Sequence, residues 1–265
     1  MQIRTWTPPP GHPLRASVIL IFRARSSGGC AETILPKGNV DILFNLAAPF
    51  ATTGTAGRVE IHSTLVAGLH THPVVSHPTG EVYLIGVSLK AEAAFDVLRS
   101  PLDELTDRAV HGSLLLSDSD RLRDRLGNEA SFTRQRLHIE RWLLGLRRVD
   151  RAAERIAAAA RLIRRTGGVS ASATQMGLSP RHLHRLFGER VGVSPADYLR
   201  LARFAAALPR LHTAVSLADV AADCGYFDQA HFCRDFRTFA SMTPKEYRRA
   251  GSVVPGHLFG TPMSD

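Results

Sequence analysis

The chain has 265 residues, a formal net charge of +9 at pH 7 and a sequence pI near 10.3. This length suits two modest domains, and the lack of an apolar run of about 20 residues excludes a membrane-spanning helix. The first residues, MQIRTWTPPPGHP, lack the apolar core of a signal peptide. The odd, scattered set of Cys30, Cys224 and Cys233 is typical of reduced thiols in a cytosolic protein.

The first ninety residues are predicted to form strands. The β-branched and apolar runs ASVILIF, VDILFNLA and VYLIGVSL are separated by the turn-forming stretches PKGN and HPTG. From Ala91 the hydrophobic period changes, and AEAAFDVLRS predicts a helix that ends before Pro101. Two more helices are expected on either side of a weak break at residues 127–131. The first half is therefore predicted to be β-rich, with flanking helices.

Four histidines in this half raise the question of a metal site. His70 and His72 form a His-x-His pair, which on a strand places both imidazoles on one face, as metal ligands require. His62 and His77 lie nearby, but Glu81 follows His72 by nine residues and no histidine lies where a later strand is expected. Turn and loop histidines are the simpler interpretation, so the sequence predicts no metal ligand, no cofactor and no catalytic residue.

Two features of the first half suggest contacts with other molecules. Trp6, Phe22, Phe44 and Tyr83 could line a pocket for a small-molecule effector, although each is also an ordinary core residue. The amphipathic stretch FTRQRLHIERWLLGL, residues 132–146, suits pairing with a second copy of the chain. Packing onto its own domain is the alternative interpretation of this helix.

Most of the basic excess lies in the second half. Residues 150–250 contain 16 Lys and Arg against nine Asp and Glu, whereas residues 1–149 contain 17 against 14. Such an excess favours a polyanionic partner, either nucleic acid or an anionic membrane surface. A merely solvated basic face is the alternative, and charge alone does not separate these interpretations.

From residue 150 onward the sequence predicts only helices, and two stretches of it repeat. Five pairs match at an offset of 49 residues: Leu183 and Phe232, Arg185 and Arg234, Phe187 and Phe236, Pro195 and Pro244, and Tyr198 and Tyr247. A solenoid needs at least three repeats for stability, so two copies indicate a duplicated supersecondary unit. The stretch between them, residues 194–213, is predicted to be a helix that holds the two units at a fixed separation.

Each copy has the layout of a helix-turn-helix. In the second copy Ser216 and Asp228 are good N-caps, and Gly225 can adopt the positive φ of a tight turn. In the first copy Ser179 is the cap of the second helix. The offset of 49 places Ser172 and Met176 at the positions of Ala221 and Gly225, so the first turn is predicted to be less regular.

The second helix of each copy has an apolar stripe, predicted to be core, and an opposite face that is predicted to bind DNA. The residues on this face are Arg181, His184 and Arg185 in the first copy, and Gln229, Ala230, Cys233, Arg234 and Arg237 in the second. Arginine can grip guanine bidentately or bind phosphate. A solvated face explains one arginine, but repetition of Arg185 at Arg234 favours DNA.

Residues of about 150–250 resemble the DNA-binding domain of AraC/XylS-type transcriptional regulators. The resemblance rests on SPRHLHRLFGERVGVSPADYLR and SLADVAADCGYFDQAHFCRDFRTFASMTPKEYRR. It implies two helix-turn-helix subdomains joined by a long helix, and sequence-specific promoter binding. Through LPKGNVDILFNL, VAGLHTHP and GVSLKAEAAFDVLRSPLDELTDRAV, the first half resembles the β-rich, cupin-like sensor domains of some members.

The sequence thus predicts an α+β protein. Residues 1–148 form a β-rich effector-sensing and dimerisation domain, 149–250 an all-α DNA-binding domain of two helix-turn-helix units, and 251–265 a flexible tail. The predicted function is a cytoplasmic, non-enzymatic regulator that reads two adjacent major-groove segments of double-stranded promoter DNA. A small-molecule effector, a homodimer and, for an activator, RNA polymerase are the further partners considered, with no membrane contact. A cupin-like metalloenzyme or metal sensor with a DNA-binding tail is the alternative.

Overall fold

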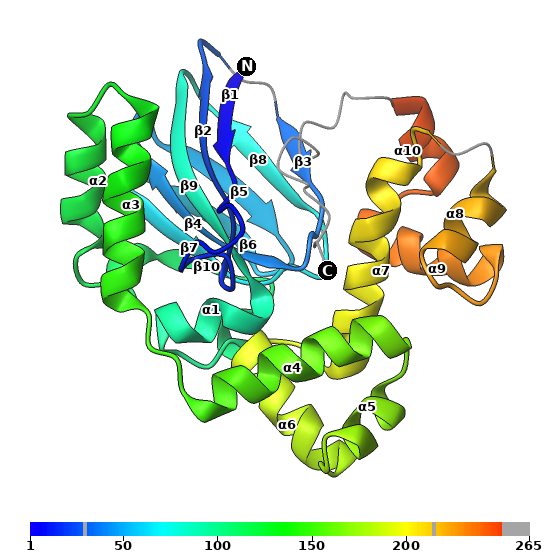
Figure 1. The fold of residues 1–265 in the computed structure, drawn as a ribbon. Coiled ribbons are helices and arrows are strands. Elements are labelled where there is room, and N and C mark those ends of the chain that lie inside the picture. The colour runs from blue at the N-terminus through cyan, green and yellow to red at the C-terminus, as the bar shows by residue number, and fades with distance from the viewer. Residues whose placement is uncertain (29–30, 214–215, 251–265) are drawn as a thin grey trace.

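The structure, a computed structural model, describes residues 1–28, 31–213 and 216–250. Cys30 and the predicted tail at 251–265 lie outside these ranges. Two β-sheets and several helices make up the N-terminal part, and the C-terminal part is built from helices (Figure 1). This arrangement confirms the predicted α+β class. Within the described ranges, no helix is both long and apolar enough to span a bilayer.

The N-terminal part contains two antiparallel sheets. In spatial order the larger sheet consists of β1 (Gln2–Trp6), β2 (Val18–Ser26), β9 (Val82–Lys90), β4 (Asn39–Asn45), β7 (Thr64–Ala67) and β10 (Ala109–His111). The smaller sheet consists of β3 (Glu32–Ile34), β8 (Val74–Pro78), β5 (Phe50–Gly54) and β6 (Gly57–Ile61). The three predicted apolar runs correspond to β2, β4 and β9. The shorter strands, of three to five residues, were missed because so few residues cannot establish a pattern.

Helices cover one face of the larger sheet (Figure 1). They are α1 (Ala91–Leu98), α2 (Ser119–Gly127) and α3 (Phe132–Leu146), with short 3₁₀ turns η1 (Asp103–Leu105) and η2 (Gly112–Leu114). Ile42 and Phe44 of β4 and Ile139 and Leu143 of α3 are fully buried in the shared core. Phe44 stacks edge-to-face on Trp142 at 5.7 Å between ring centroids. Phe44 is therefore core rather than pocket lining, and α3 packs onto its own domain.

The C-terminal part is organised around one long helix. Its elements are α4 (Arg151–Thr166), α5 (Val169–Gln175), α6 (Pro180–Val191), α7 (Pro195–Arg210), α8 (Leu217–Asp223), α9 (Gln229–Ala240) and α10 (Pro244–Ala250). Helix α7 connects α4, α5 and α6 at one end with α8, α9 and α10 at the other (Figure 1). We call α5 and α6 the first unit, and α8 and α9 the second unit.

Side-chain caps fix where these helices begin. A Ser or Asp oxygen accepts the backbone N–H three residues later, which satisfies one of the free donors of a helix start. The capping pairs are Ser179 with His182 at 3.2 Å, Ser194 with Asp197 at 3.1 Å, Ser216 with Asp219 at 3.1 Å and Asp228 with His231 at 2.6 Å. The predicted caps Ser179, Ser216 and Asp228 therefore start α6, α8 and α9.

The first unit is docked on the N-terminal domain through α1 and η1. The backbone N–H of Leu102 donates to the carbonyl of Glu189 at the end of α6, at 2.8 Å. The hydroxyl of Thr106 donates to the carbonyl of Gly192 at 2.6 Å. A Cβ on Gly192 would lie 2.7 Å from the Thr106 hydroxyl and 2.9 Å from the Leu102 carbonyl. The end of α6 therefore packs so closely on the N-terminal domain that position 192 has no room for a side chain.

A buried charge cluster joins the same two parts. Glu92 of α1 is 6% exposed, and its carboxylate accepts from Arg164 of α4 and from the Tyr198 hydroxyl of α7, each at 3.1 Å. Arg164 also donates to the Tyr198 hydroxyl. Burial and the neighbouring carboxylate hold the pKa of Tyr198 well above its ordinary value, so its proton stays in place to donate. A buried carboxylate needs such partners, since its desolvation costs several kcal/mol.

Candidate nucleic-acid interface

The turns of the two units have the same hydrogen bonds, but at an offset of 48 residues rather than 49. The N–H of Leu178 donates to the carbonyl of Ala173 at 3.0 Å, and the N–H of Tyr226 to that of Ala221 at 2.9 Å. Gly177 and Gly225 both have positive φ, at 62° and 74°. The alignment of Ser172 with Ala221 and of Met176 with Gly225 was therefore wrong by one residue.

The first turn is consequently as regular as the second. The error arose because the offset of 49 residues, which holds between α6 and α9, was applied to the turns as well. Since the turns match at 48, one additional residue must lie between the turn of the second unit and α9. Ser179 follows Leu178 directly as the cap of α6, whereas Phe227 lies between Tyr226 and the cap Asp228. The aligned repeats could not show this insertion, because all five matched pairs lie after the turns.

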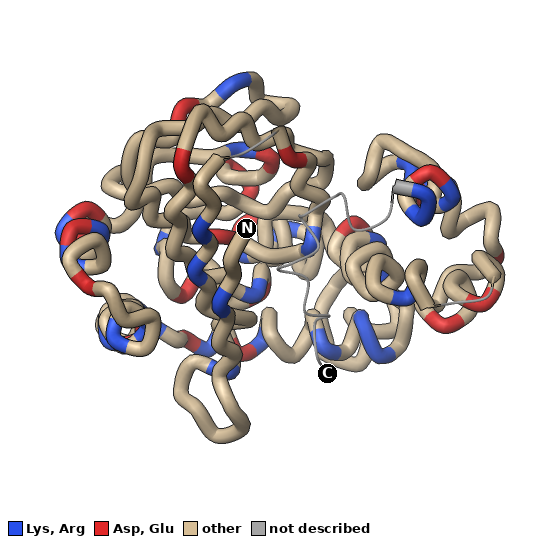
Figure 2. The backbone as a smooth tube through the Cα atoms, turned by 90° about the horizontal axis from the view of Figure 1, so that it is seen from above, with Lys and Arg blue, Asp and Glu red and all other residues tan. Residues whose placement is uncertain are grey.

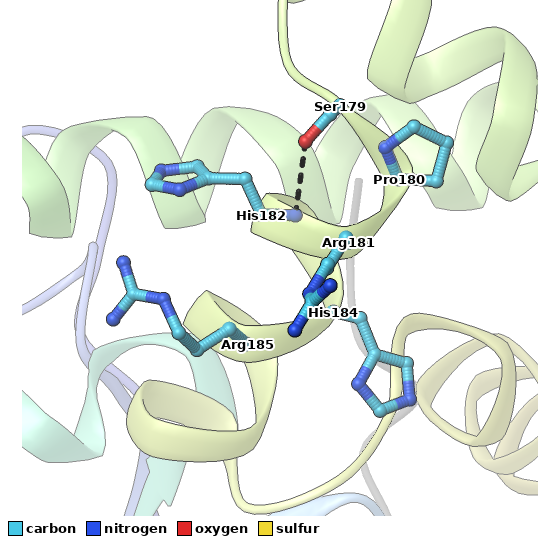
Figure 3. A pocket seen from close by; sticks show the side chains of 6 residues that line it. All are labelled: Ser179, Pro180, Arg181, His182, His184 and Arg185. Carbon is cyan, nitrogen blue, oxygen red and sulfur yellow. Dashed lines mark hydrogen bonds between the residues drawn. The ribbon is translucent and has the colours of Figure 1, made fainter.

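The predicted face of α6 lies open to solvent. Arg181, His184 and Arg185 are exposed. Together with the helix start, they line a surface hollow (Figure 3). The guanidinium of Arg185 lies 3.5 Å from the carboxylate of Glu189, one turn further along the exposed surface. Such a surface pair contributes little stability, so Arg185 remains available to another anion. The opposite residues Leu183 and Phe187 are fully buried, as the apolar stripe predicts.

The predicted face of α9 is exposed except at one position. Gln229, Ala230, Arg234 and Arg237 are exposed, whereas Cys233 is half-buried and packs against the core. Burial raises the pKa of the Cys233 thiol, which favours its neutral form. The face of α9 thus presents an amide and two arginines beside two small side chains.

An ion pair orients α9 on the connecting helix. Arg200 of α7 donates to Asp235 through Nε at 3.1 Å and through Nη2 at 3.0 Å, and to Asp197 at 3.1 Å. The hydrogen bond with Asp235 raises the pKa of Arg200. Asp235 is 5% exposed and lies on the side of α9 that faces α7. Sequence reasoning missed Asp235, although a lone acidic residue in an apolar stripe is a signal for a buried partner.

Lys and Arg residues recur along the C-terminal helices, interspersed with Asp and Glu residues (Figure 2). The exposed Arg161 and Arg165 of α4 make no ion pair within the described ranges. The basic excess of the second half is therefore partly unpaired at the surface. Unpaired arginines of this kind can bind phosphate groups, which carry no sequence information but supply affinity.

The four histidines considered as metal ligands do not converge on one point. His70 and His72 lie 3.9 and 3.5 Å from Asp107, His77 contacts Thr53 at 3.2 Å, and His62 contacts Glu60 at 3.3 Å. Burial lowers the pKa of His70. In the part of the chain that the structure describes, no three His, Cys, Asp or Glu side chains are placed to hold a metal ion.

The N-terminal domain has a half-buried polar cluster that the sequence reasoning missed. Asp41 of β4 accepts from Ser88 of β9 at 2.5 Å and from Asn39 at 2.7 Å, on the sheet face opposite the buried Ile42. Burial raises the pKa of Asp41, and burial lowers the pKa of nearby Lys37 to about 8. The available signal was a lone carboxylate within the apolar strand VDILFN.

Two helix pairs joined by α7, each with a capped second helix that has an exposed basic face, define a tandem helix-turn-helix DNA-binding domain. Residues 172–250 match a family described as a helix-turn-helix domain, and residues 7–111 match a family described as a domain of unknown function. The transcriptional activator RhaS of Escherichia coli O139:H28 is 38% identical over 80 residues. The C-terminal domain is therefore similar to the DNA-binding domains of AraC-type transcriptional regulators, as the sequence predicts.

The similarity to known proteins is partial in sequence and distant in structure. The match with RhaS spans 30% of this chain and 29% of RhaS. A solved structure of ToxT from Vibrio cholerae covers 94% of this chain and 98% of its own, at 10% identity and a TM-score of 0.49. The xylose-binding transcription activator XylR covers 50% of this chain and 37% of its own, at 22% identity and a TM-score of 0.32.

Proposed function

We propose that the whole chain is a sequence-specific transcriptional regulator that reads two adjacent major-groove segments, one with α6 and one with α9. The observation that carries this proposal is the pair of exposed basic faces, with Arg185 and Arg234 at matched positions at opposite ends of α7. Two rigidly spaced recognition helices suit groove segments about 34 Å apart on one side of DNA. Phosphate contacts supply salt-dependent affinity, and contacts with base edges supply sequence choice.

The residues proposed to contact DNA are those of the two exposed faces. They are Arg181, His184 and Arg185 of α6, and Gln229, Ala230, Cys233, Arg234 and Arg237 of α9. Arg185 and Arg234 are proposed to grip guanine or phosphate, since arginine offers a planar pair of donors. The half-buried Cys233 and the small Ala230 contribute shape and close approach rather than charge.

Residues 1–148 are proposed to be the controlling domain and residues 149–250 the DNA-binding domain. The division falls between α3 and α4. Control would enter through β9, because α1 follows it directly and packs against α4 and α6. Ser88 of β9, Asp41 of β4 and Lys37 just before β4 form a polar cluster that offers a small-molecule effector hydrogen-bonding groups of both charges.

The chain would act in the cytoplasm on double-stranded promoter DNA, without enzymatic activity, as a monomer or a homodimer. RNA polymerase would be a further partner of an activator. RhaS, which matches the C-terminal domain, is a transcriptional activator, and this supports a regulatory role.

The test is selection of bound fragments from genomic DNA by the purified full-length chain at two salt concentrations. The expected result is one shared motif with two boxes that are spaced by about one helical turn, retained at the higher salt. Binding that shows no motif and vanishes at the higher salt would overturn the proposal, because phosphate contacts alone carry no sequence information.

A further inference from the structure

The second unit has an aromatic side chain that the fold leaves in solvent. Phe227 is 92% exposed, the most exposed of the large apolar residues within the described ranges. It is the additional residue of the second turn, and it directly precedes Asp228, the cap of α9. Single exposed apolar residues are common on protein surfaces. This phenylalanine, however, lies at the start of a proposed recognition helix, where side chains contact base edges.

Packing within the unit does not explain Phe227. A residue before a helix cap often packs against the fourth residue of the helix, which here is Phe232. Tyr226 takes that place instead, because its ring lies 5.2 Å from the Phe232 ring and 5.2 Å from the His231 ring. Tyr226 is 6% exposed and also closes the turn through its backbone N–H. Phe227 is therefore available for a contact outside the chain.

The surroundings of Phe227 favour DNA over a protein partner. Asp223, Gly225, Asp228, Gln229 and Ala230 are all exposed, and none of them extends Phe227 into an apolar patch. A stable protein interface needs a larger contiguous surface with a buried centre. A base edge needs much less, since one aromatic side chain can cover the methyl group of a thymine.

We propose that Phe227 is a specificity-determining residue that contacts a thymine methyl group at the edge of the major-groove segment read by α9. This inference rests on the proposed function. The first residues of a recognition helix lie nearest the base edges, and Phe227 precedes Gln229 and Ala230 there. The first unit has no residue at this position, so Leu178 is followed directly by the cap Ser179. The two DNA segments should therefore differ. Only the segment read by α9 should require a thymine whose methyl group contacts an apolar side chain.

The test compares the full-length wild-type chain with Phe227→Ala in selection from random duplexes, followed by affinity measurements. Wild type should fix a thymine at one edge of the α9 box, and Phe227→Ala should lose that preference while keeping the rest of the motif. Replacement of that thymine by uracil removes only its methyl group, and should weaken wild-type binding about fourfold, as expected for one buried methyl group. The same replacement should leave the affinity of Phe227→Ala unchanged.

The folding of the variant is checked independently. Because Phe227 is 92% exposed, Phe227→Ala should keep the thermal midpoint and the circular dichroism of wild type. A motif and a uracil effect that are the same in both proteins would overturn the inference and leave the proposed function standing. A wild-type chain that selects no motif would overturn the proposed function, and this inference with it.

Discussion

The two helix-turn-helix units have the same internal construction but different attachments. Both close their turn with a left-handed glycine and a bond to a buried alanine, and both start the second helix with a capped N-terminus. The first unit ends at Gly192, which is pressed against Leu102 and Thr106 of the N-terminal domain. The second ends at Ser241, also left-handed but exposed.

This difference shows how one duplicated motif can serve two purposes. Tyr198 and Tyr247 are equivalent at the offset of 49, and each packs edge-to-face on the equivalent phenylalanine, Phe187 at 5.6 Å and Phe236 at 5.3 Å. Tyr198 also donates to Glu92 of the N-terminal domain. The charge cluster thus ties α4 and α7 to the N-terminal domain, whereas aromatic packing and the Arg200–Asp235 pair hold the second unit to α7. We expect the units to unfold and respond to substitution separately.

The largest expected effects come from removing one core aromatic from each unit. Phe187 and Phe236 are equivalent and fully buried, and Phe187→Ala or Phe236→Ala should each cost about 3–5 kcal/mol. Phe187→Ala should also loosen the N-terminal domain, because the first unit is docked on it. Phe236→Ala should expose mainly α8, α9 and α10 to exchange. Hydrogen exchange measured by mass spectrometry checks this. Equal loss of protection in the N-terminal sheets for both variants would contradict the comparison.

The next effect concerns the interdomain charge cluster. Glu92→Gln keeps the shape but leaves Arg164 without its carboxylate, and should lower the free energy of unfolding by about 3 kcal/mol. The contacts of α1 with α4 and α7 should weaken, so trypsin should cut faster at Arg147 or Arg148, between α3 and α4.

The matched control for this substitution is Asp235→Asn in the second unit. It breaks the pair with Arg200, which retains Asp197 as a partner. Asp235→Asn should leave the rate of cleavage at residues 147–148 unchanged, while Glu92→Gln raises it. If both variants raised that rate equally, the two attachments would not be independent.

A third prediction concerns DNA binding by the matched arginines. Arg185→Ala and Arg234→Ala should each weaken binding to the selected site by roughly 1–3 kcal/mol if they grip bases. Arg185 also contacts Glu189, so Arg234→Ala is expected to have the larger effect. Mobility shifts measure both, with Arg121→Ala on the exposed surface of α2 as the control. Unchanged affinity and unchanged base preference in both variants would refute the assignment.

The sequence predicted what local patterns determine. Apolar runs located β2, β4 and β9, and Ser179, Ser216 and Asp228 located helix starts, since a cap acts within three residues. The inserted Phe227 was missed because an aromatic among aromatics looks like core until its exposure is known. Glu92 and Asp235 were missed because their partners lie 72 and 35 residues away, beyond any local pattern.

The smallest expected effect is a pH dependence on the docked side of the first unit. Asp96 of α1 is buried, and burial raises its pKa from 3.8 to about 6, although Arg147 opposes this. Asp150, Arg99 and Arg190 also face it. A carboxyl with a raised pKa binds its proton more tightly when folded, so its contribution to stability is lost as the pH rises from about 4 to about 6.

Asp96→Asn removes this titration and should stabilise the chain by about 1 kcal/mol at pH 7.5, with no gain relative to wild type near pH 4. Thermal unfolding of both proteins across this range measures the difference. Asp150→Asn is the control of opposite sign, because bonds from Ala153 and Arg190 lower the pKa of Asp150 and make its ionised form stabilising. Asp150→Asn should therefore lose stability at pH 7.5. Equal and pH-independent effects of the two substitutions would show that the interface between α1 and the first unit opens to water.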